Sequence, residues 1–311
     1  MELIPIKTRR IGGGDNIVSV LVEGVERCQV SGFRFQDIVV ISSKAVATAE
    51  GRIIDLAKLT VSAEAKEYAK KCGLSEEFCQ AVLEETAERR GKVVGSCPGA
   101  LLTELEPTSR FGRALLDRAK PEALAKGETS GEAARPHSRR ASWTILTANA
   151  GLDQSNIAEG YAVGWPRDPA KSVASLRKAL ETHIQNSKSQ APNPKKIPST
   201  KSQKKAPRIA VILSDSCCQP RRLGVTAFAL AVSGLDPHSS QKGKLDLFGK
   251  PLRITTEAVA DQLATAANFL MGNAGESVPA VIIRDHGLPL SNFKGWVPGI
   301  AEEEDLFRGM A

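Results

Sequence analysis

Residues 208–224, RIAVILSDSCCQPRRLG, constrain the fold of this chain more than any other stretch. They open with an apolar run from Ile209 to Leu213, which is long enough for a buried strand and too short for an ordinary helix. Asp215 and Ser216 follow, where the strand should give way to a loop. Ligands collect beyond the carboxyl ends of strands in α/β sheets, and Mg²⁺ or Mn²⁺ takes oxygen ligands. The stretch therefore predicts a buried strand that ends in a cation site or, more simply, in a turn capped by Asp215.

The 311 residues can bury one large core or two smaller ones. A hydrophobic content of 41% and a charged content of 25% are those of a soluble globular protein. No stretch approaches the ~20 apolar residues of a membrane span, and the N-terminal MELIPIKTRR lacks the apolar core of a signal peptide. We therefore expect a cytoplasmic protein with no membrane partner, whose six cysteines are reduced thiols.

The net charge of +7 is concentrated in residues 187–207, which hold six lysines, four prolines and no acidic residue. Without these six lysines the chain carries only +1. Such a tract can bind polyanions by counterion release, but it holds no aromatic residue on which a base could stack. We interpret it as a solvated basic linker and do not expect a nucleic-acid partner.

A second stretch, residues 107–141, has mixed charges, several glycines and prolines, and little apolar periodicity. A connection of this length is uncommon within a compact domain. We expect an inserted surface loop with one short helix at 113–119.

The rest of the chain alternates between strand and helix patterns, which predicts an α+β fold of sheets packed with helices. Strands are expected at 2–7, 37–43, 92–103, 143–151, 252–256 and 278–283, and helices at 17–25, 62–72, 75–90, 173–184 and 257–270.

Polar residues follow three of these elements. The strand at 37–43 should deliver Ser42, Ser43 and Lys44 to a loop, where hydroxyls and an ammonium suit phosphate oxygens, although Lys44 could equally be a surface charge. The strand at 143–151 leads to Asp153 and Asn156, a second strand-end carboxylate with a neighbouring amide. The helix at 257–270 ends in a glycine-bearing loop, which suits either phosphate contacts or a plain helix cap.

Five segments in order resemble the coenzyme F-420:L-glutamate ligase family: FQDIVVISSK…AEGR, NAGLDQSN, VILSDS…RRLG, DLFGKPL and EAVADQLATAANFLMGNAGESVPAVIIR. The resemblance covers most of the chain apart from 107–141, 187–207 and about the last twenty residues. It implies one ligase-like unit over 1–311, of one or two subdomains, with the mixed α and β fold of this family, and a homodimer.

The resemblance also assigns roles to residues. It makes Asp153, Asp215 and Ser216 metal ligands, and puts Asn273 where the family has a further ligand. The residues that would contact the nucleotide are Ser43, Lys44, Asn156, Met271, Gly272, Asn273, Ala274, Gly275 and Glu276. Arg222 would assist with phosphate charge or, as the alternative, form a structural salt bridge.

The activity implied by the resemblance is a GTP-dependent amide ligation. GTP would phosphorylate an acceptor carboxylate, and the amine of L-glutamate would attack the acyl phosphate. Two Mg²⁺ or Mn²⁺ ions are implied, with a monovalent cation admitted beside them.

The chain departs from the family pattern at four places. Thr48 stands where a lysine is usual, Asn273 where a glutamate is usual, and Cys218-Gln219 replaces a Gly-Arg pair. Thr8-Arg9-Arg10 replaces a Gly-Leu-Pro loop, while Glu276 could compensate for Asn273. Three functions stay open: a γ-glutamyl ligase for the deazaflavin coenzyme, a folate glutamate ligase, and a catalytically inactive homologue that binds nucleotide and metal.

Overall fold

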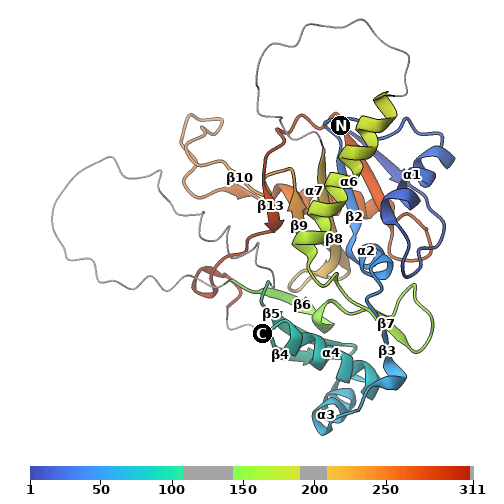
Figure 1. Cartoon of the computed structure of the whole chain (residues 1–311). Helices are drawn as coiled ribbons and strands as arrows, with labels where there is room; N and C mark the ends of the chain where they lie inside the picture. Colours follow the sequence, from blue (N-terminus) through green and yellow to red (C-terminus); the bar gives the residue numbers. More distant parts are fainter. Residues whose placement is uncertain (108–142, 190–208, 309–311) are drawn as a thin grey trace, which may run out of the picture.

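The main feature of the fold is a mixed sheet of six strands (Figure 1). The computed structural model describes residues 1–107, 143–189 and 209–308. The strands, in spatial order, are β1 (Glu2–Ile6), β12 (Ala280–Arg284), β2 (Ile38–Ser42), β8 (Ala210–Cys218), β9 (Val225–Ser233) and β13 (Lys294–Trp296). All neighbours pair antiparallel except β2 and β8, which are parallel. The predicted α+β class is confirmed, and the strand predicted from Ile209 to Leu213 lies near the centre of the sheet.

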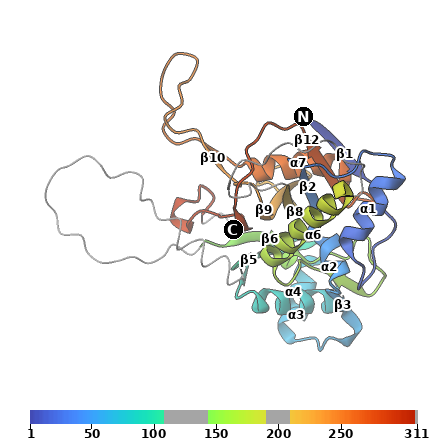
Figure 2. The ribbon, with the colours of Figure 1, turned by 45° about the horizontal axis from the view of Figure 1, so that its top comes forward.

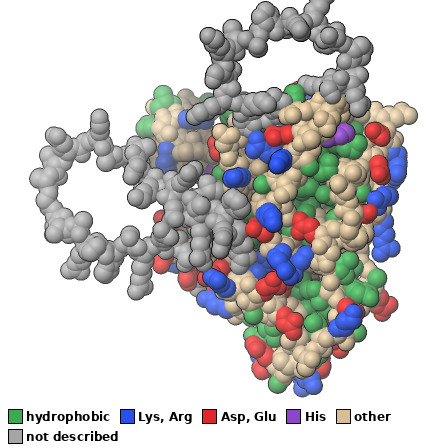
Figure 3. All heavy atoms as spheres, viewed as in Figure 1, with side chains coloured by type: hydrophobic (Ala, Val, Ile, Leu, Met, Phe, Trp, Pro, Cys, Tyr) green, Lys and Arg blue, Asp and Glu red, His purple; other side chains and the backbone are tan. Residues whose placement is uncertain are grey.

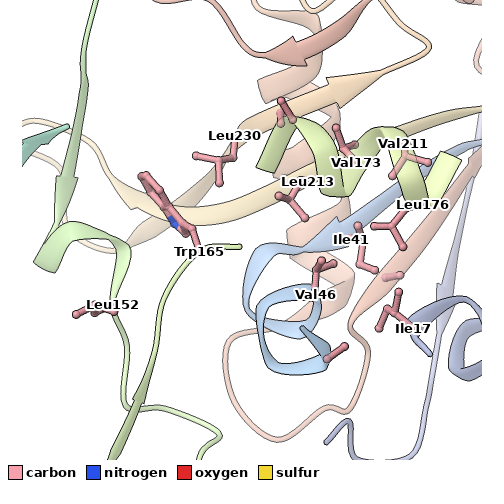
Figure 4. Packing of buried hydrophobic residues seen from close by; sticks show 14 of the residues in the cluster. Ile17, Ile41, Val46, Leu152, Trp165, Val173, Leu176, Val211, Leu213 and Leu230 are labelled. Atoms are coloured by element: carbon pink, nitrogen blue, oxygen red, sulfur yellow. The ribbon is translucent and has the colours of Figure 1, made fainter. Parts of the chain in front are cut away.

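The central strands are buried on both faces, which explains their continuous apolar runs. Val39 and Val211 pair in register and belong to the core on one face, whereas Val40 and Ile212 belong to the core on the other. The first face is covered by α1 (Ile17–Arg27), α2 (Ser43–Ala49) and α6 (Pro169–Ser189), and the second by α7 (Val259–Met271). Figure 4 shows the first core, in which residues from α1, α2 and α6 pack on β2 and β8.

A second region lies at the lower end of the molecule in Figure 1. It contains α3 (Ala63–Cys72), α4 (Glu76–Glu88), the sheet of β4 (Lys92–Cys97), β5 (Ala100–Leu105) and β6 (Ile145–Ala148), and the pair β3 (Ile53–Asp55) and β7 (Tyr161–Val163). Ser62 and Ser75 cap α3 and α4 through their hydroxyls, which accept the backbone N–H groups of Ala65 and Phe78. The strand expected at 92–103 is instead a hairpin of two strands.

A narrow arm projects from the main sheet between β10 (Ser239–Ser240) and β11 (Thr256–Glu257), as Figure 2 shows. Its turn is closed by the Asp246 carboxylate, which accepts the backbone N–H groups of Phe248 and Lys250, both at 2.8 Å. The strand predicted at 252–256 is limited to Thr256–Glu257. The helix α7 begins at Val259, two residues later than predicted, because Glu257 still belongs to β11.

The structure differs from the sequence prediction after β2, where the expected loop is the helix α2. Ser42 keeps an extended backbone, and the small residues that follow form two helical turns. The start of the predicted basic linker is also helical, because α6 continues to Ser189. The remainder of that linker and the 107–141 insertion with its short helix lie outside the described residues, except for Pro107 and Ile209 at their borders.

Among the described residues, no helix has the length and apolar character needed to cross a membrane. Figure 3 shows acidic and basic side chains interspersed over one face of the molecule, without a field of one sign. All six cysteines are free thiols, as predicted.

Candidate functional site

The candidate site is a cleft of about 690 Å³ at the edge of the main sheet where the parallel strands β2 and β8 both end. Since β12 runs antiparallel to β2, the loop that precedes β12 reaches the same edge. The segment after β1 and the loop around Asp153 complete the wall. Chain segments far apart in the sequence thus meet at strand ends, the usual location of ligands in such sheets.

Two aspartates and one lysine form the charged centre of this cleft. Asp215 lies near the end of β8, and Asp153 lies in the segment between β6 and β7. Lys44, in the first turn of α2, forms an ion pair with Asp153 Oδ2, and its Nζ lies 3.9 Å from Asp215 Oδ1. The sequence prediction that the two strand-end carboxylates share one site is consistent with this geometry. Lys44 joins them as their counterion in the described structure.

The three groups influence one another's pKa. Burial alone would lower the pKa of Lys44, but the charges of Asp215 and Asp153 outweigh this effect and raise it. Burial likewise opposes ionisation of Asp153, but Lys44 and the hydrogen bonds from Ser155 lower its pKa to about 2. The deeper burial of Asp215 raises the pKa of that carboxyl despite its nearby donors. The cleft therefore holds a lysinium and an ionised Asp153 beside a carboxyl whose ionisation is disfavoured.

Trp165 is a neighbour of the site that sequence reasoning missed. Its indole Nε1 donates a short hydrogen bond to Asp215 Oδ2, while the backbone N–H of Ser216 donates to Oδ1 at 2.9 Å. The only sequence signal was the following Pro166, which marks a turn. A buried tryptophan usually pairs its N–H, but the sequence gives no partner for it.

The glycine-bearing loop before β12 forms the opposite wall. Met271, Gly272, Asn273, Ala274 and Gly275, which the family resemblance places at the nucleotide, all line the cleft. Gly272 also caps α7, with a φ of 70° that favours glycine.

Two side chains hold this loop in shape. Asn156 Nδ2 donates to the carbonyl oxygen of Ala274 at 2.9 Å, so this residue supports the loop as well as lining the cleft. Glu276 does not line the cleft, contrary to expectation, because its carboxylate turns back and accepts the N–H of Ala274 at 2.8 Å. A Cβ on Gly272 would lie 2.2 Å from Glu276 Cδ, so the carboxylate fills the space beside this glycine. In the described structure Glu276 does not replace the carboxylate missing at Asn273.

Two further predicted site residues are not brought to the cleft. Ser43 is fully buried, and its Oγ has no hydrogen-bond partner among the described residues. Because Ser43 starts a helix rather than a loop, its side chain faces the core. Arg222 lies in the exposed turn between β8 and β9 and does not line the cleft. The structure thus brings together Lys44, Asn156, Asp153, Asp215 and Ser216, but not Ser43 or Arg222.

The segment after β1 contributes residues that were noted only as a departure from the family pattern. Thr8 donates its N–H to the carbonyl of Ser277 at 2.9 Å, which ties this segment to the glycine-bearing loop. Arg9 and Arg10 both line the cleft. Arg9 forms a bidentate pair with Asp15 at 2.7 and 2.9 Å, whereas the exposed side chain of Arg10 makes no hydrogen bond or ion pair within the described ranges. Arg10 therefore adds a cation without an acidic partner to that of Lys44.

The donor set fits a hard divalent cation, which takes carboxylate, hydroxyl and amide oxygens and retains water or phosphate oxygens. Asp153 and Asp215 would hold it, with the Ser216 hydroxyl and the Asn273 amide in the same cleft. Within the described ranges, no group of three or more His, Cys, Asp and Glu side chains is arranged so that it could hold a metal ion. The two carboxylates therefore fit one cation more directly than two.

A second cleft, of about 790 Å³, lies beside α2 where α1, α4 and α6 converge. Several of its charged groups already have partners: Ser172 Oγ donates to Glu50, and Asp168 caps α6 through the N–H of Lys171 at 3.0 Å. This cleft is slightly larger, but it lies away from the strand-end carboxylates. The smaller cleft is therefore the better candidate for the functional site, because it contains both strand-end carboxylates.

Comparison with known proteins shows the family of the chain. The model of the F420-0:gamma-glutamyl ligase family matches residues 5–189 and 195–285. The coenzyme F420:L-glutamate ligase of Methanothermobacter thermautotrophicus is 32% identical over 96% of this chain and 95% of its own length. The proteins of the same name from Methanocaldococcus jannaschii and Archaeoglobus fulgidus are 31% and 30% identical, over 88% and 99% of this chain and 84% and 96% of their own. The chain therefore belongs to the F420-0:gamma-glutamyl ligase family.

Proposed function

We propose that this protein is a GTP- and divalent-cation-dependent γ-glutamyl ligase whose acceptor is a deazaflavin coenzyme of the F420-0 type. The observation that supports this most directly is the meeting of Asp153, Asp215 and Lys44 with a glycine-bearing loop in one strand-end cleft. Family membership supports the reaction class, and the relatives, which are named coenzyme F420:L-glutamate ligases, support the acceptor.

The proposed reaction has two steps. A carboxylate oxygen of the acceptor attacks the γ-phosphorus of GTP, so that GDP leaves and an acyl phosphate forms. The amine of L-glutamate then attacks the acyl carbon, inorganic phosphate leaves, and the amine loses a proton as the amide forms. Phosphoryl transfer of this kind depends mainly on positioning and charge stabilisation.

The residues of the cleft suit these tasks. Asp153 and Asp215 would hold Mg²⁺ or Mn²⁺, which neutralises phosphate charge when bound. Lys44 and Arg10 are cations within the same cleft and would bind phosphate oxygens. The loop from Met271 to Gly275 approaches with small residues, which lets backbone N–H groups come close to phosphates.

The direct test supplies the full-length protein with GTP, Mn²⁺, L-glutamate and one of two acceptors, the deazaflavin coenzyme precursor or a reduced folate. Mass spectrometry should detect one added glutamyl residue on the deazaflavin. With ¹⁸O in the acceptor carboxylate, one label should appear in the released phosphate, as an acyl phosphate requires. Product with folate alone would replace the proposed acceptor. No product with either, despite nucleotide binding, would identify an inactive homologue.

A matched pair of variants ties the activity to the cleft. Asp215→Asn should abolish product formation, because one of the two carboxylates is lost. Asp285→Asn removes an exposed aspartate just beyond the far end of β12 and should leave activity unchanged. Equal activity in both variants would contradict the assignment of the site.

We further propose that two copies associate through the arm between β10 and β11. Leu247 is fully exposed, and Phe248 and Ile254 are exposed by 87% and 84%. These residues lie on the projecting arm, whose backbone Figure 2 shows. Exposed apolar side chains gathered on one segment are typical of an interaction surface. Light scattering should find a dimer for the wild type and a monomer for the double variant Leu247→Ser, Phe248→Ser. Phe269→Ser, which removes an equally exposed phenylalanine from α7, is the control and should remain dimeric.

A further inference from the structure

Trp165 connects the second region of the molecule to the catalytic edge of the main sheet. It follows β7 closely in the chain, is fully buried, and donates its indole N–H to Asp215 on β8. We propose that Trp165 is a positioning residue, which sets the orientation of the Asp215 carboxylate and its distance from Asp153. The proposal rests on the proposed function in one respect, because it assumes that the two carboxylates bind a common cation.

The indole is held on several sides, so its N–H has a defined direction. Phe228 and Trp296 meet it edge-on, with ring centroids 6.2 and 6.3 Å away. The guanidinium of Arg89 lies over the ring at 5.4 Å. Gly151 leaves the space that the ring needs, because a Cβ there would lie 2.4 Å from Trp165 Cε2. Figure 4 shows the ring between the sheet and the segment that carries Leu152.

Arg89 is itself fixed from α4. Its Nε donates to Glu85 Oε1 at 2.7 Å, and its Nη2 donates to the carbonyl of Pro166 at 3.2 Å. Arg52 donates to the other oxygen of Glu85 at 2.7 Å. A buried, hydrogen-bonded ion network therefore supports the indole from behind, which limits its movement.

The chain segment that carries Trp165 also carries Asp153. Asp153 and Val163 exchange both backbone hydrogen bonds at 2.9 Å, two residues before the tryptophan. A shift of Trp165 would therefore be transmitted to Asp153. The indole–carboxylate contact thus links the two aspartates across two separate sheets.

The contact also limits what Asp215 can offer to a ligand. Oδ2 is occupied by the indole N–H, whereas Oδ1 accepts a backbone N–H and lies on the side of Lys44. The carboxylate therefore presents Oδ1 to the cleft and would bind a cation through one oxygen. A second-layer hydrogen bond of this kind orients a ligand and tunes its affinity.

The first experiment observes the contact without any ligand. The chain has three tryptophans, so a ¹⁵N-labelled protein should give three indole N–H signals by NMR. Among the described residues, the indole nitrogens of Trp143 and Trp296 have no hydrogen-bond partner. The Trp165 signal should therefore lie furthest downfield, and Asp215→Asn should move it upfield. If the chemical shift of the Trp165 indole N–H is unchanged in Asp215→Asn, the proposal is overturned.

The second experiment compares two tryptophan variants. Trp165→Phe removes the N–H that reaches Asp215, whereas Trp143→Phe removes a buried N–H without a described partner, from a tryptophan that does not hold the Trp165 ring. Calorimetry with MnCl₂ and GTP should show about tenfold weaker Mn²⁺ affinity for Trp165→Phe, with less than about a twofold change for Trp143→Phe. Equal losses in both variants would indicate a purely structural role and overturn the proposal.

The two readouts separate this proposal from the proposed function. If Trp165→Phe does not fold, the indole spectrum of Asp215→Asn still decides whether the contact exists. A wild-type protein that binds no Mn²⁺, with the Trp165 signal still responding to Asp215→Asn, would refute the proposed function and support the positioning of the carboxylate alone.

Discussion

The two regions that meet at the cleft each contribute an aspartate, and the two carboxyl groups have opposite electrostatic environments. Asp215 comes from the centre of the main sheet, where its side chain is 7% exposed and is held by an indole and a backbone N–H. Asp153 comes from the second region, where its side chain is 31% exposed and is held by Lys44 and Ser155. Burial dominates for Asp215 and raises its pKa, whereas nearby donors dominate for Asp153 and lower its pKa to about 2.

This difference teaches that similar sequence signals at two strand ends need not give equivalent groups. Both aspartates follow an apolar run, but only β8 has neighbours on both sides and helices on both faces. Asp215 is costly to ionise without a cation nearby, and Lys44 supplies part of that charge. Asp153 is the readily ionised partner. A divalent cation would supply to Asp215 the charge that the protein provides only in part.

The largest effect is expected from removing either carboxylate. Asp153→Ala and Asp215→Ala should each weaken Mn²⁺-dependent GTP binding by about a hundredfold or more, measured by calorimetry. Asp215→Ala should in addition lower stability by leaving the buried indole N–H unpaired, a loss that Asp153→Ala does not share. Normal binding by both variants would show that the assignment of the cation site is wrong.

A smaller effect is expected from removing the counterion between them. Lys44→Met should lower the free energy of unfolding by about 3 kcal/mol in the absence of divalent cations, because it leaves a partly buried charge unpaired. Mn²⁺ should recover part of this loss, measured by urea unfolding with and without the ion. The control Lys58→Met breaks the ion pair between Asp55 and Lys58, whose side chain is 81% exposed. It should lower the free energy of unfolding by less than about 1 kcal/mol. An equal, Mn²⁺-independent loss in both would contradict the counterion role of Lys44.

The smallest effect concerns pH. Because the folded pKa of Asp153 is lowered from 3.8 to about 2, its ionisation stabilises the fold above pH ~4, and this contribution is lost as the pH falls through ~2. The wild type should therefore lose about 2 kcal/mol more stability than Asp153→Asn between pH 4 and pH 2. Acid titrations of both proteins, monitored by circular dichroism, measure this difference in stability.

Asp215 should behave in the opposite way. Its folded pKa is raised, so ionisation costs stability as the pH rises above its unfolded value near ~4. Asp215→Asn should then gain stability relative to the wild type as the pH rises, measured without divalent cations. The same sign of pH dependence in both variants would show that the two environments are alike.

The sequence could predict much of the main sheet because its signals are local. The buried strands around Val40 and Ile212, the capped helices α3 and α4, and the apolar face of α6 all follow from periodicity and capping residues. The family resemblance, confirmed by the family match, brought Asp153 and Asp215 together before their positions were known.

Other features depended on contacts between distant segments. Ser43 was expected in a nucleotide loop, but α2 forms there and turns the side chain into the core. The sequence left open whether Glu276 compensates for the carboxylate missing at Asn273, but in the structure it folds back onto the N–H of Ala274. The loop geometry decided the position of the Glu276 carboxylate, because it places the backbone N–H of Ala274 within hydrogen-bond distance.

The sequence by itself determined strands β1, β2, β8 and β12 of the main sheet, most of the helices and the two strand-end aspartates, because apolar periodicity and side-chain chemistry are properties of single segments. Only the tertiary structure decided which charges face one another. Trp165 reaches Asp215 across 50 residues of sequence, and Lys44 reaches Asp153 across 109. The environments of the two carboxylates follow from those contacts and from burial, neither of which is written in the segments that carry them.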